Sequence, residues 1–146
     1  MIDDIHRTEL DEILFGALRA IYQFERVKVS LFDLTYEEIY LMQFLRRHSV
    51  VPMTEIAGEM HIPVSTATRL IDRLERRKLV YRRKDDRDRR KILVALAGEG
   101  EALVGKVEDH TFETVRENLN GFSRDEVRAF MNTAQCLDRI LNPRTS

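Results

Sequence analysis

The chain is poor in the residues that build disulfides, metal sites and many catalytic centres. Of its 146 residues, one is cysteine, Cys136, and four are histidine. A single cysteine excludes an internal disulfide and suits a reducing compartment, and its place on a predicted apolar helix face makes redox control a weak hypothesis. No two histidines have the i, i+3 or i+4 spacing of metal ligands on one helix. Because a Gly-rich phosphate loop and a serine elbow are also missing, we expect no metal, no cofactor and no enzymatic activity.

Long apolar runs are absent as well. No stretch approaches the roughly 20 apolar residues that a membrane-spanning helix needs, and the first residues lack a signal-peptide pattern. The composition, 43% hydrophobic and 34% charged, is typical of a globular protein with a high charge content. The length favours one domain, or one domain with an extension. We therefore expect a cytoplasmic protein.

Basic residues are concentrated in one stretch. Residues 61–91 hold 12 of the 24 lysines and arginines together with five acidic residues, a local charge of +7 in a chain whose formal charge is −1. Such an asymmetry indicates a polyanionic partner.

Within this stretch, Ala67, Leu70, Ile71 and Leu74 recur at helical spacing, which predicts a helix packed on a core. The opposite side carries hydroxyl and guanidinium groups: Ser65, Thr66, Thr68, Arg69, Arg73 and Arg76. Such groups can contact base edges and phosphates in a DNA major groove, which is wide enough for one helix. For this helix alone, an ordinary solvated face is an equally good interpretation.

Two short β-prone segments follow, at residues 79–81 and 91–96, and they predict a β-hairpin. Five of the nine residues between them, 82–90, are arginines. Alternating aspartates can hold such arginines in fixed directions, and a protruding arginine suits the negative potential of a narrow minor groove. The hairpin therefore favours DNA binding over a merely solvated surface.

Three segments carry a resemblance to a known family: TEIA at residues 54–57, IPVSTATRLIDRLE at 62–75 with Leu79-Val80 after it, and DDRDRR at 85–90. Together they resemble the winged helix-turn-helix of the MarR family of transcriptional regulators. The family's wing usually has Asp-Pro-x-Asp-Arg-Arg, and Asp86 stands here in place of the proline. The resemblance implies that the wing arginines enter the minor groove and that Asp88 orients Arg90. The expected wing contacts are Arg87, Arg89 and Arg90.

The resemblance also implies a mainly α fold with a small β wing, in which a winged helix-turn-helix lobe at 34–98 is inserted between helical dimerisation segments at 1–33 and 99–146. The residues agree. A helical apolar stripe runs from Leu10 to Tyr22 and continues toward Val29, and a second runs from Phe130 to Leu141 on one last helix. Before that helix, Gly98-Glu99-Gly100 precedes a long one that ends near Asn120. Packing within a larger monomer is the alternative to a dimer.

Two Ser/Thr-x-x-Glu sequences, at 35–38 and 123–126, are predicted capping boxes that start helices. A two-fold homodimer would bind an inverted repeat whose half-sites lie about one helical turn apart. We therefore expect a sequence-specific regulator of transcription that binds double-stranded DNA, acting as a repressor. The alternative is a winged-helix protein-interaction module without DNA binding.

The resemblance further implies a small aromatic effector, bound in a crevice between the dimer helices and the DNA-binding lobe and often releasing DNA. The candidate crevice residues are Tyr36, Tyr40, Arg46, Arg47 and His48. The alternative is that these are ordinary core and helix-end residues.

Overall fold

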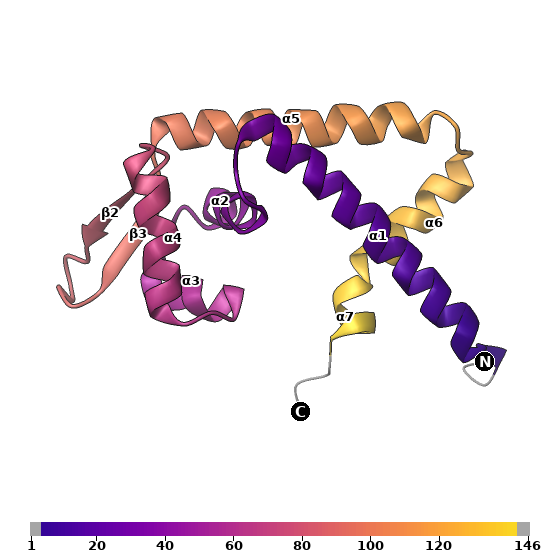
Figure 1. The fold of residues 1–146 in the computed structure, drawn as a ribbon, viewed down its shortest axis with the longest axis horizontal. Helices are drawn as coiled ribbons and strands as arrows, with labels where there is room; N and C mark the ends of the chain where they lie inside the picture. Colours follow the sequence, from indigo (N-terminus) through magenta and orange to yellow (C-terminus); the bar gives the residue numbers. More distant parts are fainter. Residues whose placement is uncertain (1–3, 143–146) are drawn as a thin grey trace. The chain divides into compact units, whose positions relative to one another are not determined.

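The computed structural model describes residues 4–142, and it is mainly helical with one small sheet, as expected (Figure 1). Its elements are α1 (Arg7–Phe32), α2 (Tyr36–His48), β1 (Val50–Pro52), α3 (Met53–Met60), α4 (Val64–Arg76), β2 (Val80–Lys84), β3 (Ile92–Leu96), α5 (Gly98–Leu119), α6 (Arg124–Gln135) and α7 (Leu137–Leu141). Within these described residues, no helix is both long and apolar enough to cross a membrane.

The chain divides into two compact units between Val107 and Glu108. The first contains α1 to α4, the sheet and the start of α5. The second contains the rest of α5 together with α6 and α7. Each unit is described by itself.

The sheet of the first unit has the strand order β1-β3-β2 and is antiparallel throughout. The predicted hairpin is confirmed as β2 and β3, paired from Val80 with Leu96 to Lys84 with Ile92. Strand β1 was not predicted from the sequence. Its three residues are too few to show an alternating pattern, and Pro52 is tolerated because β1 lies at the edge of the sheet.

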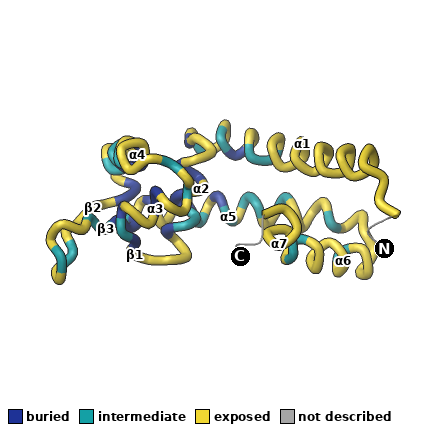
Figure 2. Tube along the Cα trace, turned by 90° about the horizontal axis from the view of Figure 1, so that it is seen from below, coloured by how far each residue is buried: buried dark blue, intermediate teal, exposed yellow. Residues whose placement is uncertain are grey.

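The core of the first unit lies between α2, α3, α4, the sheet and the start of α5, where buried residues gather in Figure 2. All four apolar residues predicted to face inward from α4 are buried, so this prediction is confirmed. The largest fully buried side chains are Ile39, Leu41, Met42, Leu45, Val51, Ile56, Ile71, Leu74, Val80, Val94, Val104 and Val107. Since full burial of one such side chain contributes about 1.5–3 kcal/mol, this core fixes how α4 and the hairpin sit together.

Local signals set the ends of the helices. The capping box of Thr35 and Glu38 is confirmed at the start of α2. Helix α3 ends at Met60, the left-handed backbone of His61 (φ 52°) turns the chain, and Pro63 then stands at the N-cap position of α4. A second left-handed residue, Lys78 (φ 60°), turns the chain from α4 into β2. The helix-turn-helix and the hairpin are thus joined by tight turns.

The start of α5 differs from the sequence expectation. The helix begins at Gly98 rather than after Gly100. Gly100 is buried against the turn before β2, where an added Cβ would lie 1.9 Å from the Leu79 carbonyl oxygen. Glycine is therefore needed at position 100 for close packing, and it does not interrupt the helix.

In the second unit, the capping box of Ser123 and Glu126 is confirmed at the start of α6. The prediction of one continuous last helix is wrong, because α6 ends at Gln135, Cys136 forms a turn, and the short α7 begins at Leu137. No described residue of α6 or α7 is buried, and the large apolar side chains of Phe130, Met131, Leu137, Ile140 and Leu141 are exposed.

Candidate nucleic-acid interface

Helix α4 has a polar outer face at its N-terminal end. Ser65, Thr66 and Arg69 are exposed, as predicted, and the first turn has no acidic residue. Thr68 is only half exposed, and its hydroxyl donates a hydrogen bond to the Val64 carbonyl oxygen at 2.8 Å. The oxygen of that hydroxyl can still accept a hydrogen bond. The first two turns of α4 therefore present hydroxyl groups and the exposed guanidinium of Arg69.

Arg73, also predicted on this face, lies in a different environment. Its Nε is 3.3 Å from Glu38 Oε1, and the Glu38 side chain is only 6% exposed. Arg77 completes the cluster, with Nη1 4.0 Å from Glu38 Oε2 and a 2.7 Å hydrogen bond to the Asp33 carbonyl oxygen. The cluster ties α4 to the start of α2. From the sequence, Glu38 was recognised only as a capping residue.

The tip of the hairpin has an ordered hydrogen-bonded shape. The Asp85 amide donates to the Lys91 carbonyl oxygen, and the Lys91 amide donates to that of Asp88. The Asp88 carboxylate accepts from both the backbone amide (3.1 Å) and Nε (3.2 Å) of Arg90. The Arg90 side chain is 92% exposed, so this pair contributes at most about 1 kcal/mol to stability. The hydrogen bond places Nε of Arg90 beside the Asp88 carboxylate, which is the pairing that the resemblance implies.

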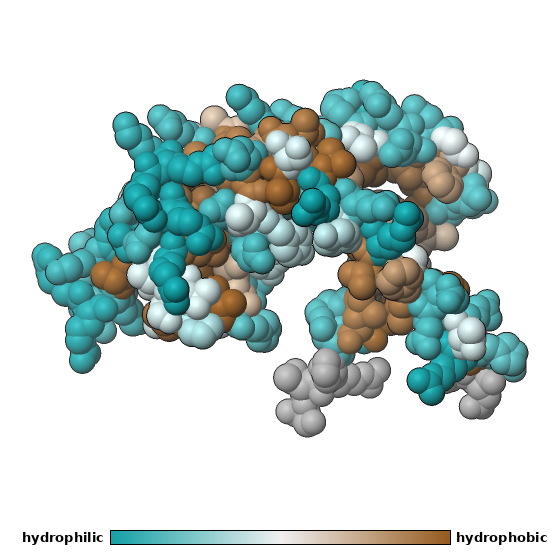
Figure 3. Space-filling model, in the orientation of Figure 1, coloured by the Kyte–Doolittle hydropathy of each residue, from teal (hydrophilic) through white to brown (hydrophobic). Residues whose placement is uncertain are grey.

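Arg87 and Arg89 are exposed at the same tip. The Arg87 amide donates to Asp85 Oδ1 at 2.9 Å, which orders the backbone before it. Hydrophilic side chains cover this end of the hairpin in Figure 3. The structure thus brings the three predicted wing arginines together on one loop.

The base of the hairpin contains a contact that the sequence reasoning missed. Arg82 of β2 lies against two carboxylates of α4, with Nη1 2.7 Å from Asp72 Oδ1 and Nη2 2.9 Å from Glu75 Oε1. Its Nε and its backbone amide also donate to Glu75 Oε2, at 3.3 and 3.1 Å. The hydrogen bond to Glu75 is the largest cause of a raised pKa of Arg82. In the sequence, Arg82 could not be separated from the other arginines of the hairpin.

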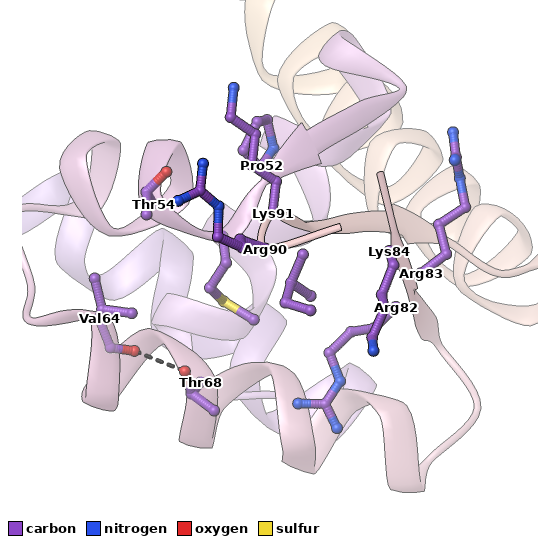
Figure 4. Close-up of a pocket in the computed structure, with 11 residues that line it drawn as sticks. Pro52, Thr54, Val64, Thr68, Arg82, Arg83, Lys84, Arg90 and Lys91 are labelled. Atoms are coloured by element: carbon purple, nitrogen blue, oxygen red, sulfur yellow. Dashed lines mark hydrogen bonds between the residues drawn. The ribbon is translucent and has the colours of Figure 1, made fainter. Parts of the chain in front are cut away.

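A hollow of about 510 Å³ lies between the start of α3, helix α4 and the hairpin (Figure 4). Its lining includes Thr54 and Thr68 and the cationic residues Lys84, Arg90 and Lys91. Among the described residues that line it, none is acidic. The charged side chains that line this hollow are therefore all cationic, and they suit a polyanion.

The five candidate effector residues do not share one cavity in the single chain. Tyr40, Arg47 and His48 line a hollow of about 660 Å³ over α2 and α3. Tyr36 lines a separate hollow of about 380 Å³ beside α1. Arg46 makes a 2.8 Å ion pair with Glu101 of α5.

Within the first of these hollows, the Tyr40 hydroxyl donates a 2.6 Å hydrogen bond to Glu59 Oε1, which raises the pKa of Tyr40 to about 12. The ring of His48 lies 4.3 Å from that of Phe44. Three of the five predicted residues are thus gathered, together with Glu59, which the sequence reasoning did not single out.

Comparison with known proteins agrees with this geometry. The MarR family model matches residues 34–92, which span the helix-turn-helix and most of the hairpin. The transcriptional regulator YsmB of Bacillus subtilis is 29% identical over 125 residues, 86% of each chain.

Among solved structures, a MarR family protein from Bacillus stearothermophilus has a TM-score of 0.82 at 24% identity, over 92% of this chain and 94% of that one. Streptococcus pneumoniae FabT, solved in complex with DNA, has a TM-score of 0.80 at 18% identity, over 93% and 97%. These two likenesses show the fold.

The fold and site define a winged helix-turn-helix protein. Its residues 34–92 are a MarR family winged helix-turn-helix, and the chain is similar to a transcriptional regulator over most of its length. Its relatives regulate transcription and are not enzymes.

Proposed function

We propose that this protein binds a specific double-stranded DNA sequence as a homodimer, with α4 in the major groove and the tip of the β2–β3 hairpin in the minor groove. The observation that carries the proposal is the pairing of two DNA-compatible elements in one lobe: the hydroxyl-rich start of α4 and the Asp88-oriented Arg90. The DNA complex of the FabT structure supports it.

The major-groove contacts come from the N-terminal half of α4. Ser65, Thr66, Thr68 and Arg69 lie where helix-turn-helix proteins contact base edges. Arg69 can bind a guanine with two hydrogen bonds, whereas Arg73, held near Glu38, contacts a phosphate. Arg69 is therefore the main source of sequence selectivity in this helix.

The minor-groove contact comes from Arg90, with Arg87 and Arg89 beside it. Fixing an unconstrained arginine costs on the order of 2 kcal/mol of rotamer entropy. The carboxylate of Asp88 removes part of this cost because it already holds Arg90 at Nε. A narrow, A·T-rich groove then attracts the guanidinium most strongly.

The homodimer is supported by the exposed apolar side chains of α1, α6 and α7. A two-fold dimer presents two α4 helices to an inverted repeat. A protein bound across such a site excludes other proteins from it, so we propose repression as the mode of action. A small aromatic anion would bind in the hollow lined by Tyr40, Arg47 and His48, because an aromatic ring and a guanidinium suit such a ligand. We propose that its binding releases the DNA.

The test is a binding-site selection with the purified full-length protein, followed by affinity measurements over a range of salt concentrations. We expect an inverted repeat and a steep salt dependence from phosphate neutralisation. A protein-interaction module without DNA binding would select no sequence and show no salt slope.

Variants then assign the contacts. Arg69→Ala should cost about 1–3 kcal/mol and blur one base pair in each half-site. Arg90→Ala should reduce the preference for A·T-rich flanks, and Asp88→Ala should lower affinity although it removes a negative charge. Lys106→Ala, an exposed cation of α5, is the control for loss of one charge. Higher affinity in Asp88→Ala would refute its orienting role.

A further inference from the structure

We propose that Arg82 is a positioning residue, which sets the direction of the wing by fixing the base of the hairpin to Asp72 and Glu75 of α4. The proposal rests on the proposed function, since it concerns how the major-groove and minor-groove elements are held relative to each other. It assigns a role to an arginine that the charge pattern alone places among the DNA contacts.

The contact joins two elements at several points. Asp72 and Glu75 are three residues apart on α4 and therefore lie on one face of the helix. The guanidinium of Arg82 spans both carboxylates through Nη1 and Nη2, while Nε contacts Glu75 again. The backbone amide of Arg82 also donates to Glu75. Strand β2 is thus attached to α4 by main chain and side chain together.

Arg82 is poorly suited to contact DNA directly. Nε, Nη1 and Nη2 each already face a carboxylate oxygen, and two negative charges offset its one positive charge. Its side chain is 32% exposed, against 92% for Arg90. In Figure 4, Arg82 points toward α4, whereas the neighbouring Arg83 points away from it.

Because Arg82 lies near the base of the hairpin, a small tilt of the hairpin at this contact displaces its tip by a larger distance. In β2 only Val80 is buried, and the following residues extend away from the core. Arg82 pairs with the fully buried Val94 in β3, which places its contact with α4 at the base of the hairpin, before the tip. Three or four residues at about 3.3 Å each separate it from the tip, so a tilt of about 10° at the base moves Arg90 by about 2 Å. Such a shift exceeds the tolerance of a hydrogen bond.

The first experiment is a double-mutant cycle in DNA affinity on the operator selected by the wild-type protein. Arg82→Met keeps the length and apolar stem of the side chain but removes the fork. We expect it to lower affinity about tenfold or more, with the fold retained by circular dichroism. Arg90→Ala should lower DNA affinity by a similar factor in the wild-type background but by less than about threefold in Arg82→Met, because the displaced wing no longer places Arg90 in the minor groove.

Three outcomes are separable. If the two substitutions multiply independently, Arg82 acts as a direct contact or a general stabiliser, and the positioning role is overturned. If Arg82→Lys restores full affinity, charge rather than the two-carboxylate fork matters, and the proposal also fails. If the wild-type protein selects no operator, the proposed function itself has failed.

Substitutions of the two carboxylates give an independent test, because the two explanations predict opposite changes in DNA affinity. Asp72→Asn and Glu75→Gln each remove a negative charge close to the DNA-binding surface, so simple attraction to DNA would raise affinity. Positioning requires the opposite, a loss that grows in the double variant. Glu55→Gln, at an exposed acidic residue of α3, is the matched control and should leave affinity level or raise it. Unchanged or higher affinity in Glu75→Gln would contradict the proposal.

Discussion

The winged helix-turn-helix lobe and the terminal helices both have apolar stripes in sequence, but these stripes differ in burial in the structure. In α4, Ile71 and Leu74 are 0% exposed. In α1, Ile13 and Leu18 are 61% and 63% exposed. Figure 2 shows the same contrast, with buried residues gathered in the lobe and α1, α6 and α7 exposed along most of their length. Hydrophobic side chains also gather around α7 in Figure 3.

A periodic stripe therefore indicates that a face will be covered, but not what covers it. The lobe covers its own stripes, because α2, α3, α4 and the sheet enclose one core. The terminal helices expose a series of large apolar side chains, far more than the scattered ones that are normal on a monomer. In the proposed homodimer, a second copy of the chain offers the matching faces.

The largest expected effect comes from breaking the exposed stripe of α1. Leu18→Asp places a carboxylate where the dimer would bury an apolar side chain, which costs several kcal/mol and occurs twice in a two-fold dimer. We expect the variant to be monomeric at micromolar concentration by sedimentation. Gln23→Asp adds the same charge at an exposed polar position of the same helix and should remain dimeric. A dimeric Leu18→Asp protein would refute this role for α1.

A smaller effect is expected inside the lobe, at Gly100. Because an added Cβ would lie 1.9 Å from the Leu79 carbonyl oxygen, Gly100→Ala must displace the start of α5 from the turn before β2. We expect a loss of about 2–3 kcal/mol in the free energy of unfolding, measured with urea, and no change in oligomeric state.

The same substitution elsewhere in α5 is its control. At Gly105 an added Cβ would meet no atom of the described residues within 4 Å beyond its own turn of the helix, and Gly105→Ala should be neutral or stabilising by up to about 1 kcal/mol. Equal stabilities of the two variants would show that the contact at Gly100 relaxes without cost.

What the sequence could predict was local. The buried face of α4, the hairpin and both capping boxes depend on residues a few positions apart, and all are confirmed. The contact of Glu38 with Arg73 joins residues 35 positions apart, and no periodicity indicates it. Strand β1 exists only because β3 offers it an edge. The break at Cys136 has no glycine or proline to mark it, and we have no sequence signal for it.

In the candidate site, too, the contacts between residues close in sequence could be predicted and the contacts made by packing could not. Residue types indicated that the hairpin was a wing, and the pairing of Asp88 with Arg90 spans only two positions. The role of Arg82 depends on Asp72 and Glu75 lying across from it, which only the packing of β2 beside α4 determines. The effector residues were chosen by type and nearness in sequence, and packing then separated Tyr36 and Arg46 from the rest.

The smallest expected effect is a pH dependence at the surface of the lobe. The pKa of Tyr40 is raised from 10.0 to about 12, first by the hydrogen bond that it donates to Glu59, then by burial and by the negative charge of Glu59. Ionisation would remove the donor and place a phenolate beside a carboxylate, so the folded state favours the neutral tyrosine. Its contribution to stability is therefore fully present below pH 10 and is lost as the pH rises through about 12.

Near-ultraviolet absorbance, which increases as tyrosine ionises, measures this directly. We expect one tyrosine of the folded protein to ionise near pH 12, and Tyr40→Phe to remove that step. Glu59→Gln keeps a hydrogen-bond acceptor but not the charge, so it should move the step part of the way back toward 10.0. Because Tyr40 lies on the lobe and not on α1, α6 or α7, the step should be the same in the monomeric Leu18→Asp variant. A step that disappeared with the dimer would instead place the hydroxyl of Tyr40 under the influence of the second copy.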